Sequence, residues 1–181
     1  KTKAIIVVHM LGVPARLKEI KTIADKHGIS LIEDTAWGCG GYYNDIPLGT
    51  YGNIGTYSFD FAKTMTTGEG GMVVFKDKHL YEKAAAWHDH GHENNPKFPR
   101  GKDTHRIPGF NYRVSEIVGA IGLIQLTKMS KIIRFNKKYY KMYEKTLKKY
   151  KDINLRKIPR QNKPLMDCII FNFKNKKIAT L

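Results

Sequence analysis

A strand–helix–strand unit near the start of the chain limits the fold more than any other feature. Residues 4–8 (AIIVV) form a continuous apolar run, which is typical of a strand covered on both faces. Pro14 opens the segment ARLKEIKTIADKHG, where apolar residues recur at helical spacing until Gly28. The run ISLIED then predicts a short strand ending in two carboxylates. A helix joining two strands in this way indicates a parallel crossover and an α/β fold.

The middle of the chain predicts a hairpin, so the sheet is expected to be mixed. Residues 57–61 and 72–75 are strand-like, and the glycine-rich segment TTGEGG between them predicts a turn. Asp77 is an N-cap candidate for a helix that runs to Gly91. The polar stretch at residues 92–106 predicts an exposed loop of unusual length, which favours a functional role.

Two further helices are expected toward the C-terminus. The segment NYRVSEIVGAIGLIQLTKM has apolar residues on one helical face, and a lysine- and tyrosine-rich helix follows at about residues 131–150. One more apolar run, CIIFNF, comes near the end, where the pattern predicts the start of a new subdomain. Since the chain also opens directly into a strand, we expect it to be a piece of a longer protein.

Charge is the strongest compositional signal, with a formal net charge of +16 over 181 residues. It is compatible with nucleic acid, a membrane surface or an anionic substrate. However, the excess is scattered lysine without an arginine-rich block or an RNA-binding motif, so a lysine bias on solvated faces explains it equally well. No apolar run has membrane-spanning length, and two cysteines make no disulfide framework. We therefore expect a cytoplasmic protein without nucleic-acid or membrane partners.

Lys63 poses the main chemical question, because lysine is rarely buried without a partner. Asp34 ends a predicted strand at the sheet edge where ligands usually bind, and Ser58 and Lys63 accompany another predicted strand. An amine, a carboxylate and a hydroxyl together suit pyridoxal phosphate, whose aldehyde, ring nitrogen and phosphate they would bind. From the residues alone, a surface lysine in a turn fits the pattern about as well.

Several linked motifs add a family resemblance. The segments IEDTAWGCGG, GNIGTYSFDFAKTMTTGEGGMVVF, HDHG and GFNYRVSEIVGAIGLIQL, in this order, resemble the DegT/DnrJ/EryC1/StrS sugar aminotransferases. The resemblance implies the fold-type I aminotransferase architecture, pyridoxal 5'-phosphate as cofactor, and a homodimer with shared active sites. Residues 1–130 would then be part of the large cofactor-binding domain. Residues 131–181 would be a linking helix and the start of a small, truncated C-terminal α/β domain.

The same resemblance assigns site residues by position. Lys63 matches the catalytic lysine that bonds to the cofactor, Asp34 the partner of its ring nitrogen, and Ser58 a phosphate ligand. Asn111 matches an asparagine that reaches the phosphate in the neighbouring subunit's site. Trp37 stands where the family usually has glutamine or histidine, so it is expected to contact the cofactor differently or to shape a substrate pocket. Retention of lysine, which dehydrating relatives replace by histidine, favours transamination.

The implied reaction transfers an amino group from glutamate to a carbonyl sugar in cell-surface polysaccharide or lipopolysaccharide biosynthesis. Segments such as EDTAWGCGG and HDHGHENNPKFPRG are most similar to the branch that forms 8-amino-3,8-dideoxyoctulosonate. A nucleotide-linked keto sugar is the alternative acceptor. Because the family's N-terminal phosphate loop is not in this sequence, a non-catalytic piece that only dimerises is a further alternative.

Other patterns have plainer interpretations. The histidines of WHDHGHEN alternate in a segment that ends a helix, so they do not share one face and no metal site is predicted. TTGEGG lacks the lysine and hydroxyl of a P-loop and leads into a strand. Arg113 is expected to form an ion pair that anchors the following helix. In the long loop, Arg100, Lys102, His105 and Arg106 are candidates for contacts to an anionic substrate or a partner subunit.

Overall fold

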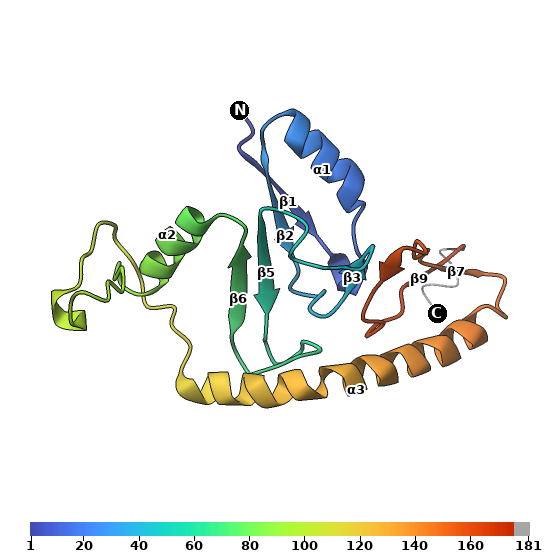
Figure 1. Cartoon of the computed structure of the whole chain (residues 1–181). Helices are drawn as coiled ribbons and strands as arrows, with labels where there is room; N and C mark the ends of the chain where they lie inside the picture. The colour runs from blue at the N-terminus through green and yellow to red at the C-terminus, as the bar shows by residue number, and fades with distance from the viewer. Residues whose placement is uncertain (176–181) are drawn as a thin grey trace.

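The computed structural model describes residues 1–175 and confirms the α/β prediction (Figure 1). The elements are β1 (Ala4–Val8), the 3₁₀ turn η1 (Met10–Gly12), α1 (Leu17–Lys26), β2 (Ser30–Asp34), β3 (Tyr42–Tyr43), β4 (Ile46–Pro47), β5 (Ile54–Ser58), β6 (Gly71–Phe75), α2 (Lys78–His88), the 3₁₀ turn η2 (Arg100–Lys102), α3 (Glu116–Leu147), β7 (Ile153–Leu155), β8 (Asn162–Lys163) and β9 (Phe171–Phe173). None of the described helices is both long and apolar enough to cross a membrane.

The main sheet has four strands in the order β1-β2-β5-β6. The first three are parallel, and β6 pairs with β5 as an antiparallel hairpin strand, so the predicted crossover and mixed sheet are both confirmed. However, β5 is Ile54–Ser58, which corrects the expected strand at residues 57–61. The chain leaves the strand earlier because the Asp60 carboxylate accepts a hydrogen bond from the Ala62 N–H at 3.0 Å and closes a turn.

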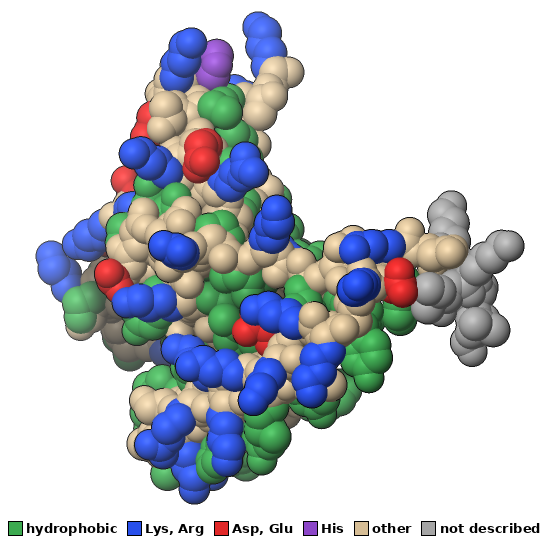
Figure 2. All heavy atoms as spheres, turned by 90° about the vertical axis from the view of Figure 1, so that its right-hand side faces the viewer, with side chains coloured by type: hydrophobic (Ala, Val, Ile, Leu, Met, Phe, Trp, Pro, Cys, Tyr) green, Lys and Arg blue, Asp and Glu red, His purple; other side chains and the backbone are tan. Residues whose placement is uncertain are grey.

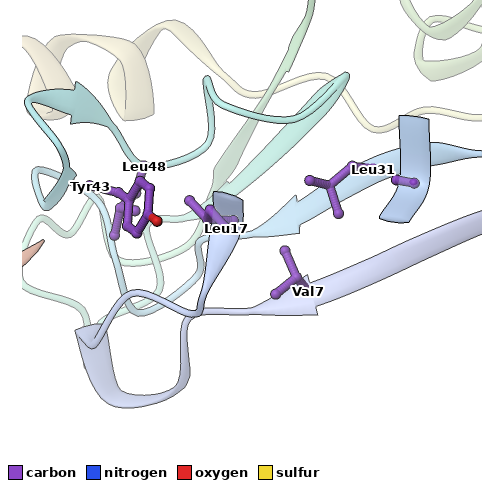
Figure 3. Close-up of a cluster of buried hydrophobic side chains, with 6 residues drawn as sticks. Val7, Leu17, Leu31, Tyr43 and Leu48 are labelled. Atoms are coloured by element: carbon purple, nitrogen blue, oxygen red, sulfur yellow. The ribbon is translucent and has the colours of Figure 1, made fainter. Parts of the chain in front are cut away.

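The hydrophobic core lies between α1 and one face of this sheet (Figure 3). Val7 and Leu31 point from β1 and β2 toward Leu17 of α1, and Tyr43 and Leu48 close the cluster. Leu17 and Leu31 are both 0% exposed. Burial of such side chains contributes about 1.5–3 kcal/mol each, so this cluster fixes α1 on the sheet.

The opposite face of the sheet is open in the part of the chain that the structure describes. Ile6 is 67% exposed, Val8 42% and Val73 49%. The prediction that residues 4–8 are covered on both faces is therefore wrong for this chain. Alternation along β1 turns Val7 toward α1 and turns its two neighbours away, where no described helix packs on them.

The long helix α3 corrects another expectation, since one continuous helix replaces the two predicted around residue 130. The junction TKMSKII contains no glycine or proline that would end a helix. Ser115 caps α3 by accepting a hydrogen bond from the Val118 N–H at 3.4 Å. In Figure 1, α3 runs beneath the lower end of β5, from the α2 side of the molecule to the β7–β9 side.

Helix α2 begins as predicted, with the Asp77 carboxylate accepting a hydrogen bond from the Leu80 N–H at 2.8 Å. It ends at His88, before the expected Gly91. Gly91 has φ +84°, and a Cβ there would lie 2.2 Å from the Ile107 carbonyl oxygen, so only glycine fits. The division at residue 130 into two domains stays a prediction, and α3 crosses that boundary.

Candidate active site

The candidate site lies at the edge of the sheet where its parallel strands end. β1, β2 and β5 run in the same direction, so their carboxyl ends meet at one edge. Asp34 ends β2 and Ser58 ends β5, while Asp34 pairs in register with Val8 and Thr56. Alternation therefore places the Asp34 and Ser58 side chains on the open face of the sheet. Ligands of open α/β sheets bind at such edges.

Asp34 keeps most of its hydrogen-bonding capacity. Its Oδ1 accepts a hydrogen bond from the Ala36 N–H at 3.0 Å, and its carboxylate has no further hydrogen-bond partner in the described part of the chain. The residue is half-buried. A carboxylate held in this way is oriented by the backbone yet free to bind a cationic group.

The neighbouring Glu33 points to the opposite, closed face and is 0% exposed. It accepts hydrogen bonds from the N–H groups of Gly52 at 2.7 Å and Gly49 at 3.0 Å, and lies 2.9 Å from His9 Nε2. Burial alone raises the pKa of the Glu33 carboxyl, but the bonds to His9, Gly52 and Gly49 together hold this pKa below its ordinary value. Glu33 thus remains an anion inside the protein.

His9 fixes the geometry of this buried pair. Its Nδ1 accepts a hydrogen bond from the Ala15 N–H at 3.2 Å, so the other nitrogen, Nε2, carries the proton that is donated to Glu33. The pair ties the end of β1 to β2 directly beside Asp34. Sequence reasoning missed both residues as parts of the site; the adjacent carboxylates of IED were the available signal.

Lys63 contacts the indole ring of Trp37. Its Nζ lies 4.0 Å from the ring centroid, and the side chain is half-buried. It forms no ion pair with any residue in the described range. The aromatic face therefore stabilises the ammonium group through a cation–π interaction. Because Trp37 follows Asp34 by three residues, this contact holds Lys63 at the same edge of the sheet.

The turn predicted for TTGEGG is confirmed and holds the Lys63 segment. The Phe59 N–H donates to the Gly70 carbonyl at 2.9 Å, and the Thr67 N–H donates to the Phe59 carbonyl at 2.9 Å. Gly70 has φ +146°, where side chains other than hydrogen are rarely accommodated. Behind Lys63, the Thr64 hydroxyl donates to Asp167 Oδ2 at 3.1 Å, so a distant segment closes this side of the site.

Asn111 lies apart from the other predicted site residues. It pairs with Asp89 in an isolated bridge, and its side-chain oxygen accepts a hydrogen bond from Arg113 Nε at 3.1 Å. Among the described residues, no interaction joins it to Asp34, Ser58 or Lys63. Its expected role concerns a neighbouring subunit, which one chain does not test, so that role stays a prediction.

An ion-pair cluster anchors the long loop. Arg100 binds the buried Asp89 carboxylate with two hydrogen bonds, at 2.7 and 2.9 Å, and Arg113 approaches it at 3.3 Å as predicted. The hydrogen bonds from Arg100 hold the pKa of Asp89 well below its usual range. Arg106 faces Glu93 at 3.5 Å. Contacts of this loop to an anionic substrate stay a prediction, since two of its cations are already engaged within the chain.

The histidines around this loop do not form a metal site in the part of the chain that is described. His92 and His105 contact each other through Nδ1 and Nε2 at 2.7 Å, and His88 bonds the carbonyl of Ala85 at 2.5 Å. The pair is adjacent to one carboxylate, Asp103, at 3.3 Å from His92. These contacts are structural ones within the loop.

The residues at the sheet edge fit pyridoxal phosphate. Lys63 offers an amine without an anionic partner in the described range, Asp34 a carboxylate with an unused oxygen, and Ser58 a hydroxyl. Ser58 Oγ accepts a hydrogen bond from the Asp60 N–H at 3.3 Å, which leaves its own proton to donate. This donor set matches the aldehyde, ring nitrogen and phosphate of that cofactor.

Comparison with known proteins identifies the family. Residues 1–180 match the DegT/DnrJ/EryC1/StrS aminotransferase family. The chain belongs to this family. It is 37% identical to the GDP-perosamine synthase of Escherichia coli O157:H7 over 147 residues, which cover 81% of the chain and 39% of that protein. The chain thus spans well under half the length of the curated relative.

Several solved structures share the fold of this chain. The aminotransferase TlmJ of Streptoalloteichus hindustanus matches with a TM-score of 0.90 at 23% identity, over 99% of this chain and 48% of its own. The E. coli GDP-4-keto-6-deoxy-D-mannose-3-dehydratase, solved with bound hydrated PLP, matches with a TM-score of 0.86 at 28% identity, over 96% and 47%. These matches confirm that the chain has the sugar aminotransferase fold.

Proposed function

We propose that this chain carries the catalytic lysine of a pyridoxal phosphate-dependent aminotransferase that transfers an amino group from glutamate to a carbonyl sugar. The observation that carries the proposal is the Lys63 amine, which lies over Trp37 at the sheet edge that also holds Asp34 and Ser58. Family membership and the cofactor in a related structure support it. The retained lysine favours amino transfer over the dehydration catalysed by that relative.

Each residue of the candidate site has a different role in the proposed reaction. Bound pyridoxal phosphate supplies an electron sink for a carbanion next to nitrogen. Lys63 provides the amine that holds the cofactor and moves a proton at the reacting carbon. The Asp34 carboxylate keeps a ring N–H in place by accepting its hydrogen bond, and Ser58 Oγ donates to a phosphate oxygen. Trp37 shields one side of the Lys63 amine from water.

Two alternative acceptors of the amino group are proposed. Several relatives are named GDP-perosamine synthases, which supports a nucleotide-linked keto sugar. The alternative is the 8-aldehyde that leads to 8-amino-3,8-dideoxyoctulosonate, whose carboxylate would suit the basic residues of the long loop. Both acceptors belong to polysaccharide or lipopolysaccharide biosynthesis in the cytoplasm, where the free Cys39 and Cys168 would stay reduced. A homodimer with shared sites would bring Asn111 to the partner's cofactor.

The test is cofactor attachment followed by acceptor choice in the full-length protein. Pyridoxal phosphate should produce a visible absorption band that glutamate bleaches, and borohydride should fix the cofactor to the peptide containing Lys63. Lys63→Ala should lack the band, whereas the exposed Lys78→Ala should keep it. Amination of a GDP-linked keto sugar, compared with the octulosonate aldehyde, then selects the acceptor.

Absence of covalent attachment at Lys63 in the full-length protein would exclude the aminotransferase proposal. Attachment without amino transfer to any carbonyl sugar would leave a cofactor-binding protein of another reaction. A chain that dimerises but binds no cofactor would support the non-catalytic alternative.

A further inference from the structure

A large basic groove lies away from the sheet edge that holds Lys63 (the Lys63 edge), on the side of the molecule where α3 meets the C-terminal segment. Its volume is about 1180 Å³, and its walls come from residues 13–16, the second half of α3, and residues 155–166. Figure 2 faces this side, and Lys and Arg side chains crowd along it with few acidic ones between them. The volume is somewhat above the usual range for small-molecule sites, so it exceeds what a single inorganic anion needs.

The charge lining this groove is strongly one-sided. Eight lysine and arginine side chains line it against a single acid, Glu144, which already binds Lys148 at 2.9 Å. Two more of the eight cations also have partners within the chain: Arg156 donates a hydrogen bond to the Met10 carbonyl at 2.9 Å, and Lys163 binds Asp45. Within residues 1–175, the remaining five form no ion pair or side-chain hydrogen bond: Arg16, Lys137, Lys141, Lys157 and Arg160.

Converging cations of this kind repel one another unless an anion lies between them. A groove lined by one sign of charge concentrates the field inside it, because its low-dielectric walls focus the field lines. Phosphate groups carry enough charge and enough acceptor oxygens to satisfy several lysines and arginines at once. The floor is apolar, with Val13, Tyr140 and Pro164 among its residues, and suits the ring of a sugar or base.

The groove is separate from the candidate active site. Leu165 and Asp167 face the small cavity beside Lys63 and Trp37, whereas Pro164 and Met166 line the groove. Alternate residues of this segment therefore point into different cavities. Neither Lys63 nor Asp34 lines the groove.

We propose that the basic groove binds a phosphorylated sugar or nucleotide through its phosphate groups, at a site distinct from the Lys63 edge. The five cations left without a partner in residues 1–175 bind the phosphate oxygens, and the apolar floor packs against the attached ring. The site requires no reaction at Lys63, so it stands independently of the proposed aminotransferase activity.

The test measures binding by calorimetry in the full-length protein, with GDP, GDP-mannose and inorganic pyrophosphate as probes. GDP should bind, and the Lys141→Gln/Arg160→Gln double variant should weaken this binding about 100-fold, since each of the two lost charged contacts costs about tenfold. Lys128→Gln, which removes one positive charge from an exposed part of α3 outside the groove, should alter affinity less than about twofold. Lys63→Ala should bind GDP as well as the unaltered protein.

The probes also separate the possible sources of phosphate. Tighter binding of GDP-mannose than of GDP identifies a nucleotide-linked sugar, whereas equal binding of pyrophosphate identifies phosphate recognition alone. If the double variant unfolds, hydrogen exchange in the unaltered protein should show GDP-dependent protection in residues 155–164 and the second half of α3. No binding of any probe, an equal loss with Lys128→Gln, or stronger competition by a single-stranded oligonucleotide would overturn the proposal.

Discussion

The two faces of the four-stranded sheet are built from the same strands but serve opposite purposes. On the closed face, Val7 and Leu31 pack against α1, and Glu33 lies buried among hydrogen-bond donors. On the open face, Val8 and Asp34 lie side by side in register, and Val8 is 42% exposed. One residue of register thus separates the part of the sheet that stabilises the fold from the part that offers chemistry.

The adjacent carboxylates show what this difference means. Glu33 has three hydrogen-bond partners and no exposed surface, whereas Asp34 has one backbone partner among the described residues. A buried carboxylate without its donors would carry a large desolvation penalty, so Glu33 needs these hydrogen bonds and its role is structural. Asp34 has unused hydrogen-bonding capacity among the described residues, so it can bind a ligand. The following predictions test this division of roles, beginning with the largest expected effect.

Asp34→Asn should abolish most activity while sparing the fold. A neutral amide cannot hold a proton on the cofactor's ring nitrogen, so we expect turnover in the full-length protein to fall about 1000-fold or more, which corresponds to about 4 kcal/mol of lost transition-state stabilisation. The oxygen of the introduced amide can still accept the hydrogen bond from the Ala36 N–H, so the free energy of unfolding should change by less than about 0.5 kcal/mol. Turnover and urea unfolding measure the two effects; retained activity would contradict the assigned role.

Glu33→Gln, in contrast, should destabilise the fold. The amide group of glutamine places a donor against the His9 or glycine donors, so we expect the free energy of unfolding to fall by about 2–4 kcal/mol. Urea unfolding measures this, with the exposed Glu69→Gln as the matched control, which should cost less than about 0.5 kcal/mol. Equal stabilities of the two variants would show that the Glu33 network contributes little.

Acid titration sharpens the same comparison. The pKa of Glu33 in the folded protein lies below its ordinary value of 4.5, so its contribution to stability is complete above that value. It is lost as the pH falls through the lower folded-state pKa, because the unfolded chain then binds the proton more tightly. Urea unfolding between about pH 3 and pH 6 should therefore show a steeper acid loss in the unaltered protein than in Glu33→Gln. Parallel curves would contradict this.

Trp37→Leu should have the smallest effect. Loss of the aromatic ring removes a cation–π contact of about 0.5–1 kcal/mol and exposes the Lys63 amine to water. The rate of Lys63 acetylation, measured by mass spectrometry of its peptide, should rise about two- to fivefold in Trp37→Leu. The rate in Trp37→Phe should lie between those of the unaltered protein and Trp37→Leu. A Lys63 labelling rate that does not respond to Trp37 would show that the ring does not shield the amine.

Much of this arrangement was predictable, because it depends on local patterns. Apolar runs and helical spacing located β1, α1 and β2, the Asp77 cap located α2, and the motif order identified the family. The errors arose where tertiary context decides. The β5 strand ends early because Asp60 closes a turn, and α3 continues because nothing in its middle breaks it. Coverage of β1 depended on packing that its own sequence does not describe.

The sequence by itself determined the α/β fold class, the order of its main elements, and which residues carry an amine, a carboxylate and a hydroxyl. Only the tertiary structure decided which groups meet: Lys63 with Trp37, Glu33 with His9, and Thr64 with Asp167, 103 positions along the chain. The physical reason is that periodicity and capping act over a few residues. Burial, hydrogen bonding and ion pairing depend on contacts that the closed fold alone creates, as in the basic groove where three distant segments converge.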